Sequence, residues 1–111
     1  MNMQKKLNYT FSAKEMHTLD IVISDYLSTY EIDLDFLDES ISKLVLFEWY
    51  KRNLSKFKFP QDKNKVSFKQ AEYVAFLSHF KEVDHFMIKD ICQNVITLLT
   101  GGTLPKKKIL K

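Results

Sequence analysis

The chain has 111 residues, of which 45% are hydrophobic and 28% charged, and it contains only two glycines and two prolines. These proportions exclude the disordered, collagen-like and low-complexity classes. The net charge is +3, and the length fits one domain, which we expect over residues 1–104, followed by a basic tail over residues 105–111.

The first two predicted elements are a short strand and an amphipathic helix. Residues 7–11 alternate apolar and polar side chains, as a half-buried strand does. Ser12 and Glu15 then form a capping box, in which each side chain satisfies a backbone N–H of the first helical turn. The apolar side of the helix consists of Met16, Leu19, Val22, Ile23, Tyr26, Leu27 and Tyr30.

A second helix is predicted to begin near Asp33 or Asp35 and to end at about Lys56. Asp38 and Glu39 lie in its first turn, where negative charge favours the positive end of the helix dipole. We expect its main apolar arc to face the core. This arc contains Phe36, Leu37, Ile41, Leu44, Val45, Phe47 and Leu54.

Two more helices are predicted in the second half of the chain. The third follows Ser67, which has the spacing of a capping box with Gln70. The fourth is capped by Asp84 and ends before Gly101 and Gly102. A helical hairpin is favoured over a helix-turn-helix that reads DNA, because Asp90 would repel phosphates and the fourth helix has too little basic surface.

These elements predict a mainly α fold, a compact four-helix bundle. Residues 66–68 alternate in the same way as residues 7–11, so the two stretches are candidates for a small two-stranded β-ribbon.

The second helix carries more apolar surface than one core face needs. Leu46 and Trp49 fall on the side that also carries acidic side chains, away from the main arc. We therefore expect a docking surface for a protein partner or a second copy of the chain, formed by Leu46, Trp49, Phe47 and Tyr50. The alternative is a core that encloses this helix on nearly all sides.

Residues 51–69 suggest a second class of partner, because basic and aromatic side chains alternate there as on a surface for single-stranded nucleic acid. The candidate contacts are Lys51, Arg52, Lys56, Phe57, Lys58, Phe59, Lys63 and Lys65. The alternative is a solvated loop whose two phenylalanines pack onto the core. Lysine dominance favours this alternative, since lysine lacks the planar fork of arginine.

No residue pattern points to catalysis, so we expect no enzyme activity, cofactor or metal. Cys92 lies on an apolar arc, where a thiol is usually an inert packing residue. His79 and His85 do not have the spacing of metal ligands on one helix. Glu48 is expected to form an ion pair with Arg52, four residues later.

The same patterns bear on localisation and on the overall hypothesis. The uncharged stretch over residues 91–105 is shorter than the ~20 apolar residues that a membrane-spanning helix needs, and the N-terminus lacks the apolar region of a secretory signal. We expect a cytoplasmic, non-enzymatic interaction or regulatory module without a membrane partner. Self-association is the preferred function, and nucleic-acid binding is the alternative.

Overall fold

A computed structural model describes residues 6–28 and 34–102 of the chain. Within these ranges the elements are β1 (Lys6–Ser12), α1 (Ala13–Ser28), α2 (Leu37–Arg52), α3 (Leu54–Lys58), β2 (Lys63–Lys69), α4 (Gln70–Phe80) and α5 (Phe86–Leu99). The predicted Tyr30, the predicted start at Asp33 and the predicted tail over residues 105–111 lie outside the described residues.

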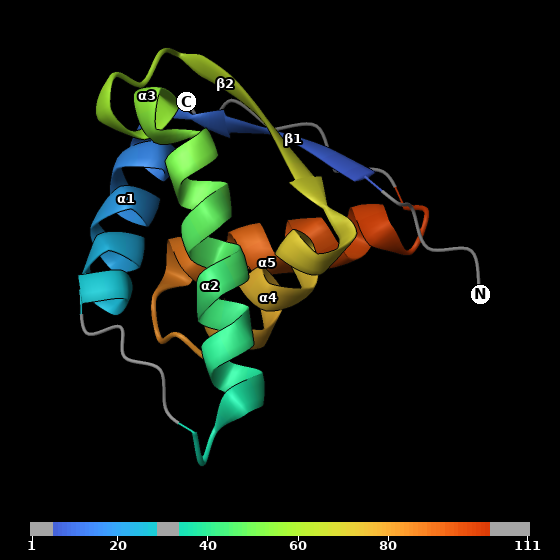
Figure 1. Ribbon diagram of the computed structural model, residues 1–111. Helices are drawn as coiled ribbons and strands as arrows, with labels where there is room; N and C mark the ends of the chain where they lie inside the picture. Colours follow the sequence, from blue (N-terminus) through green and yellow to red (C-terminus); the bar gives the residue numbers. More distant parts are fainter. Residues whose placement is uncertain (1–5, 29–33, 103–111) are drawn as a thin grey trace.

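The described part of the chain is mostly helical with a small two-stranded sheet, as predicted, but the number of helices differs from the four of the predicted bundle. It contains five helices and a two-stranded sheet. Figure 1 shows the sheet lying across one end of the helices, while the opposite end of α2 projects beyond the other labelled elements. The sheet adds a layer to the structure that a helical bundle does not have.

The predicted ribbon is confirmed and is longer than expected. β1 and β2 pair antiparallel, with Leu7 opposite Phe68, Tyr9 opposite Val66 and Phe11 opposite Asn64. The inner face of the sheet is buried, and its apolar side chains are Leu7, Tyr9, Phe11, Val66 and Phe68. Because two strands alone are marginally stable in water, the helices beneath this face stabilise the ribbon.

The start of α1 confirms the predicted capping box. The Ser12 backbone N–H donates to Glu15 Oε1 at 2.9 Å, and the Glu15 backbone N–H donates to Ser12 Oγ at 3.1 Å. Met16, Leu19 and Ile23 are fully buried on the predicted apolar side. These two features depend on residues that are close in sequence.

The predicted second helix is interrupted at Asn53. The Asn53 side-chain amide donates to the Trp49 carbonyl at 2.9 Å, and its backbone N–H donates to the same oxygen at 3.2 Å. A side chain that donates to the carbonyl of the preceding turn shares the acceptor of the helical ladder and favours a bend in the helix. The chain therefore leaves α2 after Arg52 and forms the short helix α3, which buries Phe57.

Both predicted caps in the second half of the chain are wrong. Ser67 lies within β2, and the carboxylate of Glu72 caps α4 by accepting the Lys69 backbone N–H at 2.7 Å. At α5, His85 Nδ1 accepts the Met87 backbone N–H at 3.2 Å, in the role predicted for Asp84. The strand pairing and the loop between the helices, rather than local spacing, decide which residue caps each helix.

Candidate protein-interaction surface

The side of α2 that packs into the core carries Leu46 and Trp49, each 0% exposed. The indole N–H of Trp49 donates to the Ser67 carbonyl at 3.0 Å, and its ring stacks on Phe68 with 4.6 Å between centroids. Tyr50 is also buried. The prediction that Leu46, Trp49 and Tyr50 form a docking surface is therefore wrong, because a single chain encloses all three.

The packing and the hydrogen bond of the Trp49 side chain explain which side of α2 faces the core. Its ring also meets Phe57 and Phe76 edge-on, with centroid distances of 5.6 and 5.8 Å. A buried tryptophan contributes a large apolar area but needs an acceptor for its N–H, and the Ser67 carbonyl on β2 supplies one. Packing of this one side chain turns the opposite side of α2 toward solvent.

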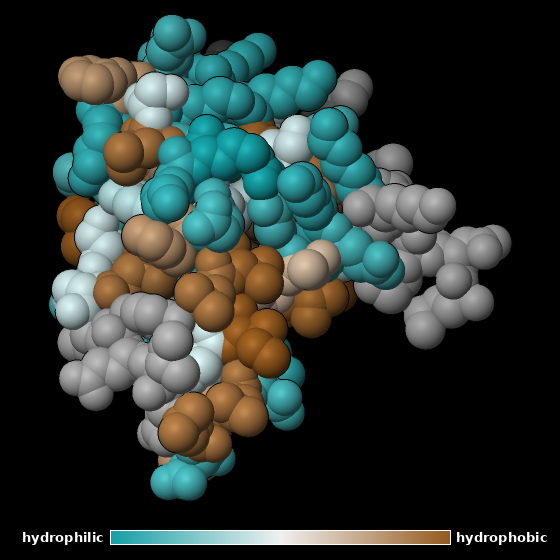
Figure 2. Space-filling model, viewed as in Figure 1, coloured by the Kyte–Doolittle hydropathy of each residue, from teal (hydrophilic) through white to brown (hydrophobic). Residues whose placement is uncertain are grey.

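That opposite side is an exposed stripe, which we call the α2 apolar face and define as Leu37, Ile41, Leu44 and Phe47. Their exposed fractions are 51%, 57%, 43% and 40%. Spacings of four, three and three residues place them on one side of the helix. Figure 2 shows apolar surface running along α2. The prediction that this arc faces the core is wrong, and of the predicted partner-binding residues only Phe47 is exposed.

Opposite charges lie at the two ends of α2. Asp38 and Glu39 occupy its first turn, whereas Lys51 and Arg52 occupy its last turn. The Lys51 ammonium lies 3.6 Å from Glu48 and 5.0 Å from the centroid of the Phe47 ring. The α2 apolar face thus runs between an acidic end and a basic end.

Arg52 does not form the predicted ion pair with Glu48. Its guanidinium instead contacts both carboxylate oxygens of Glu72, at 2.5 and 2.6 Å. Burial alone would raise the pKa of Glu72, but the hydrogen bonds from Arg52 and from the Lys69 backbone N–H lower it. This bidentate pair joins the C-terminal end of α2 to α4, so the Arg52 guanidinium has a structural role.

The basic and aromatic side chains of residues 51–69 do not form one surface. Phe57 is 2% exposed and lies in the core, whereas Phe59 is 80% exposed. The Lys58 ammonium lies 3.3 Å from Asp20, and the Lys56 ammonium donates to the carbonyl of Lys65. The predicted nucleic-acid surface is thus divided between core contacts, ion pairs and exposed residues.

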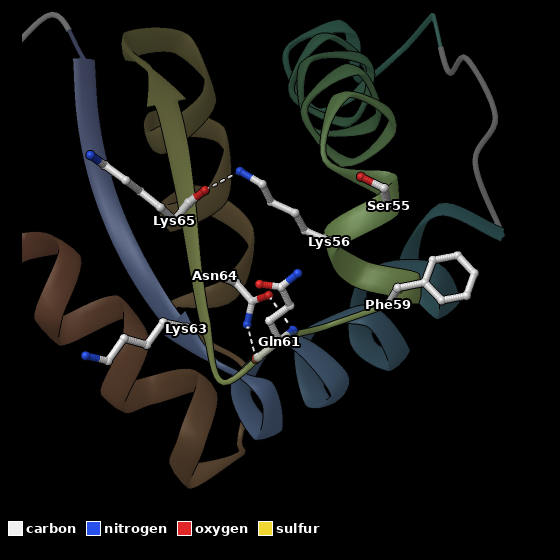
Figure 3. Close-up of a pocket in the computed structure, with 7 residues that line it drawn as sticks. All are labelled: Ser55, Lys56, Phe59, Gln61, Lys63, Asn64 and Lys65. Carbon is white, nitrogen blue, oxygen red and sulfur yellow. Dashed lines mark hydrogen bonds between the residues drawn. The ribbon is translucent and has the colours of Figure 1, made fainter.

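A hollow of about 470 Å³ lies between α3 and β2, lined by Ser55, Lys56, Phe59, Gln61, Lys63, Asn64 and Lys65. Figure 3 shows the Phe59 ring pointing to one side of this region, while Lys63 and Lys65 extend to the other. The Asn64 side chain accepts the Gln61 backbone N–H at 2.8 Å and donates to the carbonyl of Phe11. The lining side chains do not converge on one point as ligand-binding groups do.

Two further titratable groups in the described part of the chain, Cys92 and His79, are buried and partly buried respectively. Burial raises the pKa of the Cys92 thiol to about 11, so the thiol is neutral and weakly reactive near pH 7. The Tyr26 hydroxyl lies 2.7 Å from Nδ1 of His79, and burial lowers the pKa of that histidine. Residues 6–28 and 34–102 contain no group of three or more potential metal ligands.

Comparison with known proteins indicates neither a family nor a function for the chain. The chain matches no protein-family model, no curated protein and no solved structure. In the part of the chain that the structure describes, no helix has both the length and the apolar character needed to cross a bilayer.

Proposed function

We propose that the protein is a non-enzymatic interaction module that self-associates through the α2 apolar face. One observation carries the proposal: four large apolar side chains, each at least 40% exposed, lie in a row on one helix. A helix that is apolar on two sides is normally covered on both, and a continuous exposed apolar patch is typical of a contact surface.

The partner that fits this face best is a second copy of the chain, with its α2 antiparallel. The acidic first turn of each helix then lies near Lys51 in the last turn of the other, while Arg52 stays paired with Glu72. A two-fold axis at Leu44 places Leu37 opposite Lys51 of the other copy and Ile41 opposite Phe47. The same surface contributes from both copies, as in most closed homodimers.

The expected association is weak. Full burial of a leucine, isoleucine or phenylalanine side chain contributes ~1.5–3 kcal/mol, and these side chains are already about half buried. The eight side chains from the two copies together contribute on the order of 10 kcal/mol on burial. The loss of translational and rotational freedom on association costs about 4–15 kcal/mol. The dimer is therefore expected to exchange with monomer at micromolar to millimolar protein concentrations.

Sedimentation equilibrium up to about 1 mM protein tests this function, because a dimer stabilised by only ~4 kcal/mol is substantially populated there. We expect a reversible monomer–dimer equilibrium that Leu44→Glu abolishes, since it places two carboxylates at the two-fold axis. The matched control is Ile96→Glu, at a partly exposed isoleucine of α5. A monomer throughout the range would refute the proposal, as would a Leu44→Glu variant that dimerises like the wild type.

A further inference from the structure

The outer face of the two-stranded sheet is rich in lysine. The register of β1 and β2 places four pairs on this face, namely Lys6 with Lys69, Asn8 with Ser67, Thr10 with Lys65, and Ser12 with Lys63. Every second residue of each strand is buried on the other side, so these eight side chains lie on the solvent side. None of them is acidic or apolar. We call the eight residues the ribbon face.

Within the described residues no lysine of the ribbon face forms an ion pair, although the charge of Lys69 helps to lower the pKa of nearby Glu72. The ion pairs found there involve Lys51, Arg52, Lys58 and Lys89. Lys6 lies directly opposite Lys69, and like charges at directly opposed positions of a sheet destabilise it. A polyanion bound on this face would relieve that repulsion.

Lys56 extends the positive charge beyond the edge of the sheet. Its ammonium donates to the carbonyl of Lys65, so the side chain bridges α3 and β2. Figure 3 shows this bridge on the α3 side of β2, whereas the side chains of Lys63 and Lys65 extend together on the other side of the strand. Lys56 therefore adds a positive charge beside β2, next to the ribbon face rather than on it.

We propose that the ribbon face binds the phosphate backbone of a nucleic acid without reading its bases. Alternate residues of a strand are about 6.8 Å apart, so Lys63 and Lys65 present two neighbouring ammonium groups along β2. The hydroxyl groups of Thr10 and Ser12 lie directly opposite Lys65 and Lys63 and can donate to phosphate oxygens. The one arginine in the chain, Arg52, is held by Glu72, so no guanidinium fork is free for a base edge.

An anionic membrane fits this face less well. Peripheral membrane binding combines basic charge with apolar side chains that enter the bilayer interface. The ribbon face has no apolar side chain, and the ring of exposed Phe59 points away from Lys63 and Lys65. Nucleic-acid phosphate requires only charge and hydrogen-bond donors, and this face supplies both.

Fluorescence anisotropy of a labelled duplex and a labelled single strand of mixed sequence tests the inference on the full-length chain. Four phosphate contacts on a duplex predict that affinity falls on the order of 100-fold between about 50 and 200 mM salt. We expect Lys63→Gln combined with Lys65→Gln to weaken binding and to reduce the salt slope by roughly two units. The matched control is Lys81→Gln with Lys89→Gln, which changes the net charge equally at exposed lysines outside the sheet.

Three results would overturn the inference. The first is no binding of either nucleic acid at low salt. The second is an equal loss of affinity in the Lys63/Lys65 and Lys81/Lys89 variants, because general charge would then explain the binding. The third is binding to anionic phosphatidylserine vesicles without binding to nucleic acid. Circular dichroism of each variant establishes that a loss of affinity is not a loss of folding. These outcomes are independent of self-association, since they concern the sheet and not α2.

Discussion

Trp49 on α2 stacks on Phe68 of β2, with 4.6 Å between the ring centroids and 16° between the ring planes. The hydrogen bond from the Trp49 indole to the Ser67 carbonyl lies beside this stack. The two interactions attach the middle of the chain to the sheet and fix which side of α2 is buried. The exposed α2 apolar face is a consequence of this attachment.

Truncation of Trp49 should destabilise the protein severely. Large aromatic-to-alanine changes in cores cost about 3–5 kcal/mol, so Trp49→Ala should lower the free energy of unfolding by that amount in urea titrations. Trp49→Phe keeps a ring but removes the indole hydrogen bond to the Ser67 carbonyl, which still accepts from Arg52 Nη2 at 3.2 Å, so it should cost less, about 0.5–1.5 kcal/mol. Equal effects of the two substitutions would contradict the role assigned to ring packing.

The fluorescence of Trp49 should not report self-association. It is the only tryptophan, and one chain buries it completely. We therefore expect blue-shifted emission that stays constant when the protein is diluted from the dimer to the monomer. A red shift on dilution would show that the partner chain, rather than the protein's own core, shields the indole.

Cysteine cross-linking should reveal the antiparallel arrangement of α2. In the proposed dimer Leu44 lies at the two-fold axis, so Leu44→Cys should form an intermolecular disulfide under mild oxidation, whereas Leu37→Cys alone should not. Mixing the Leu37→Cys protein with a Lys51→Cys protein should restore cross-linking. Native Cys92 is buried and serves as the internal control. Efficient cross-linking of Leu37→Cys to itself would indicate a parallel pair and contradict the proposed geometry.

The ion pair between Arg52 and Glu72 should make stability depend on pH in the acid range. The folded pKa of Glu72 lies below its ordinary value of 4.5, so the folded state binds fewer protons than the unfolded state there. This contribution is complete above the ordinary pKa and is lost as the pH falls through the lower, folded pKa. Thermal melts of the wild type and Glu72→Gln should therefore converge as the pH falls from about 6 to 3. Parallel pH profiles of the two proteins would contradict this prediction.

A charge reversal at Lys6 should change the stability of the fold and the affinity for nucleic acid in opposite directions. Lys6→Glu places opposite charges across the strands, at Lys69, and should raise the free energy of unfolding by about 0.2–1 kcal/mol while weakening nucleic-acid binding. Lys6→Gln, which removes the repulsion without adding an attraction, should have a smaller effect on both. If Lys6→Glu stabilised the fold and left nucleic-acid affinity unchanged, Lys6 would not belong to the binding face.

The sequence by itself determined the features that depend on neighbouring residues. The Ser12–Glu15 capping box involves groups three residues apart, and the buried side of α1 follows from a helix with one apolar side and one polar side. The alternation in residues 7–11 and 66–68 likewise identified the inner face of the ribbon. In each of these segments the local pattern admits one orientation, because only one side can be buried without burying polar groups.

Only the tertiary structure decided the orientation of α2, and with it the candidate site. Apolar residues occupy two sides of this helix, so periodicity alone could not say whether Leu46 and Trp49 or Leu37 and Leu44 face the core. The choice depended on an acceptor for the Trp49 N–H at Ser67, a contact between residues 18 positions apart in the sequence. The break at Asn53 and the pairing of Arg52 with Glu72 are also decided by contacts that form only when the chain is packed. Local sequence identified a surplus of apolar surface on α2, and long-range packing determined which part of it remained exposed.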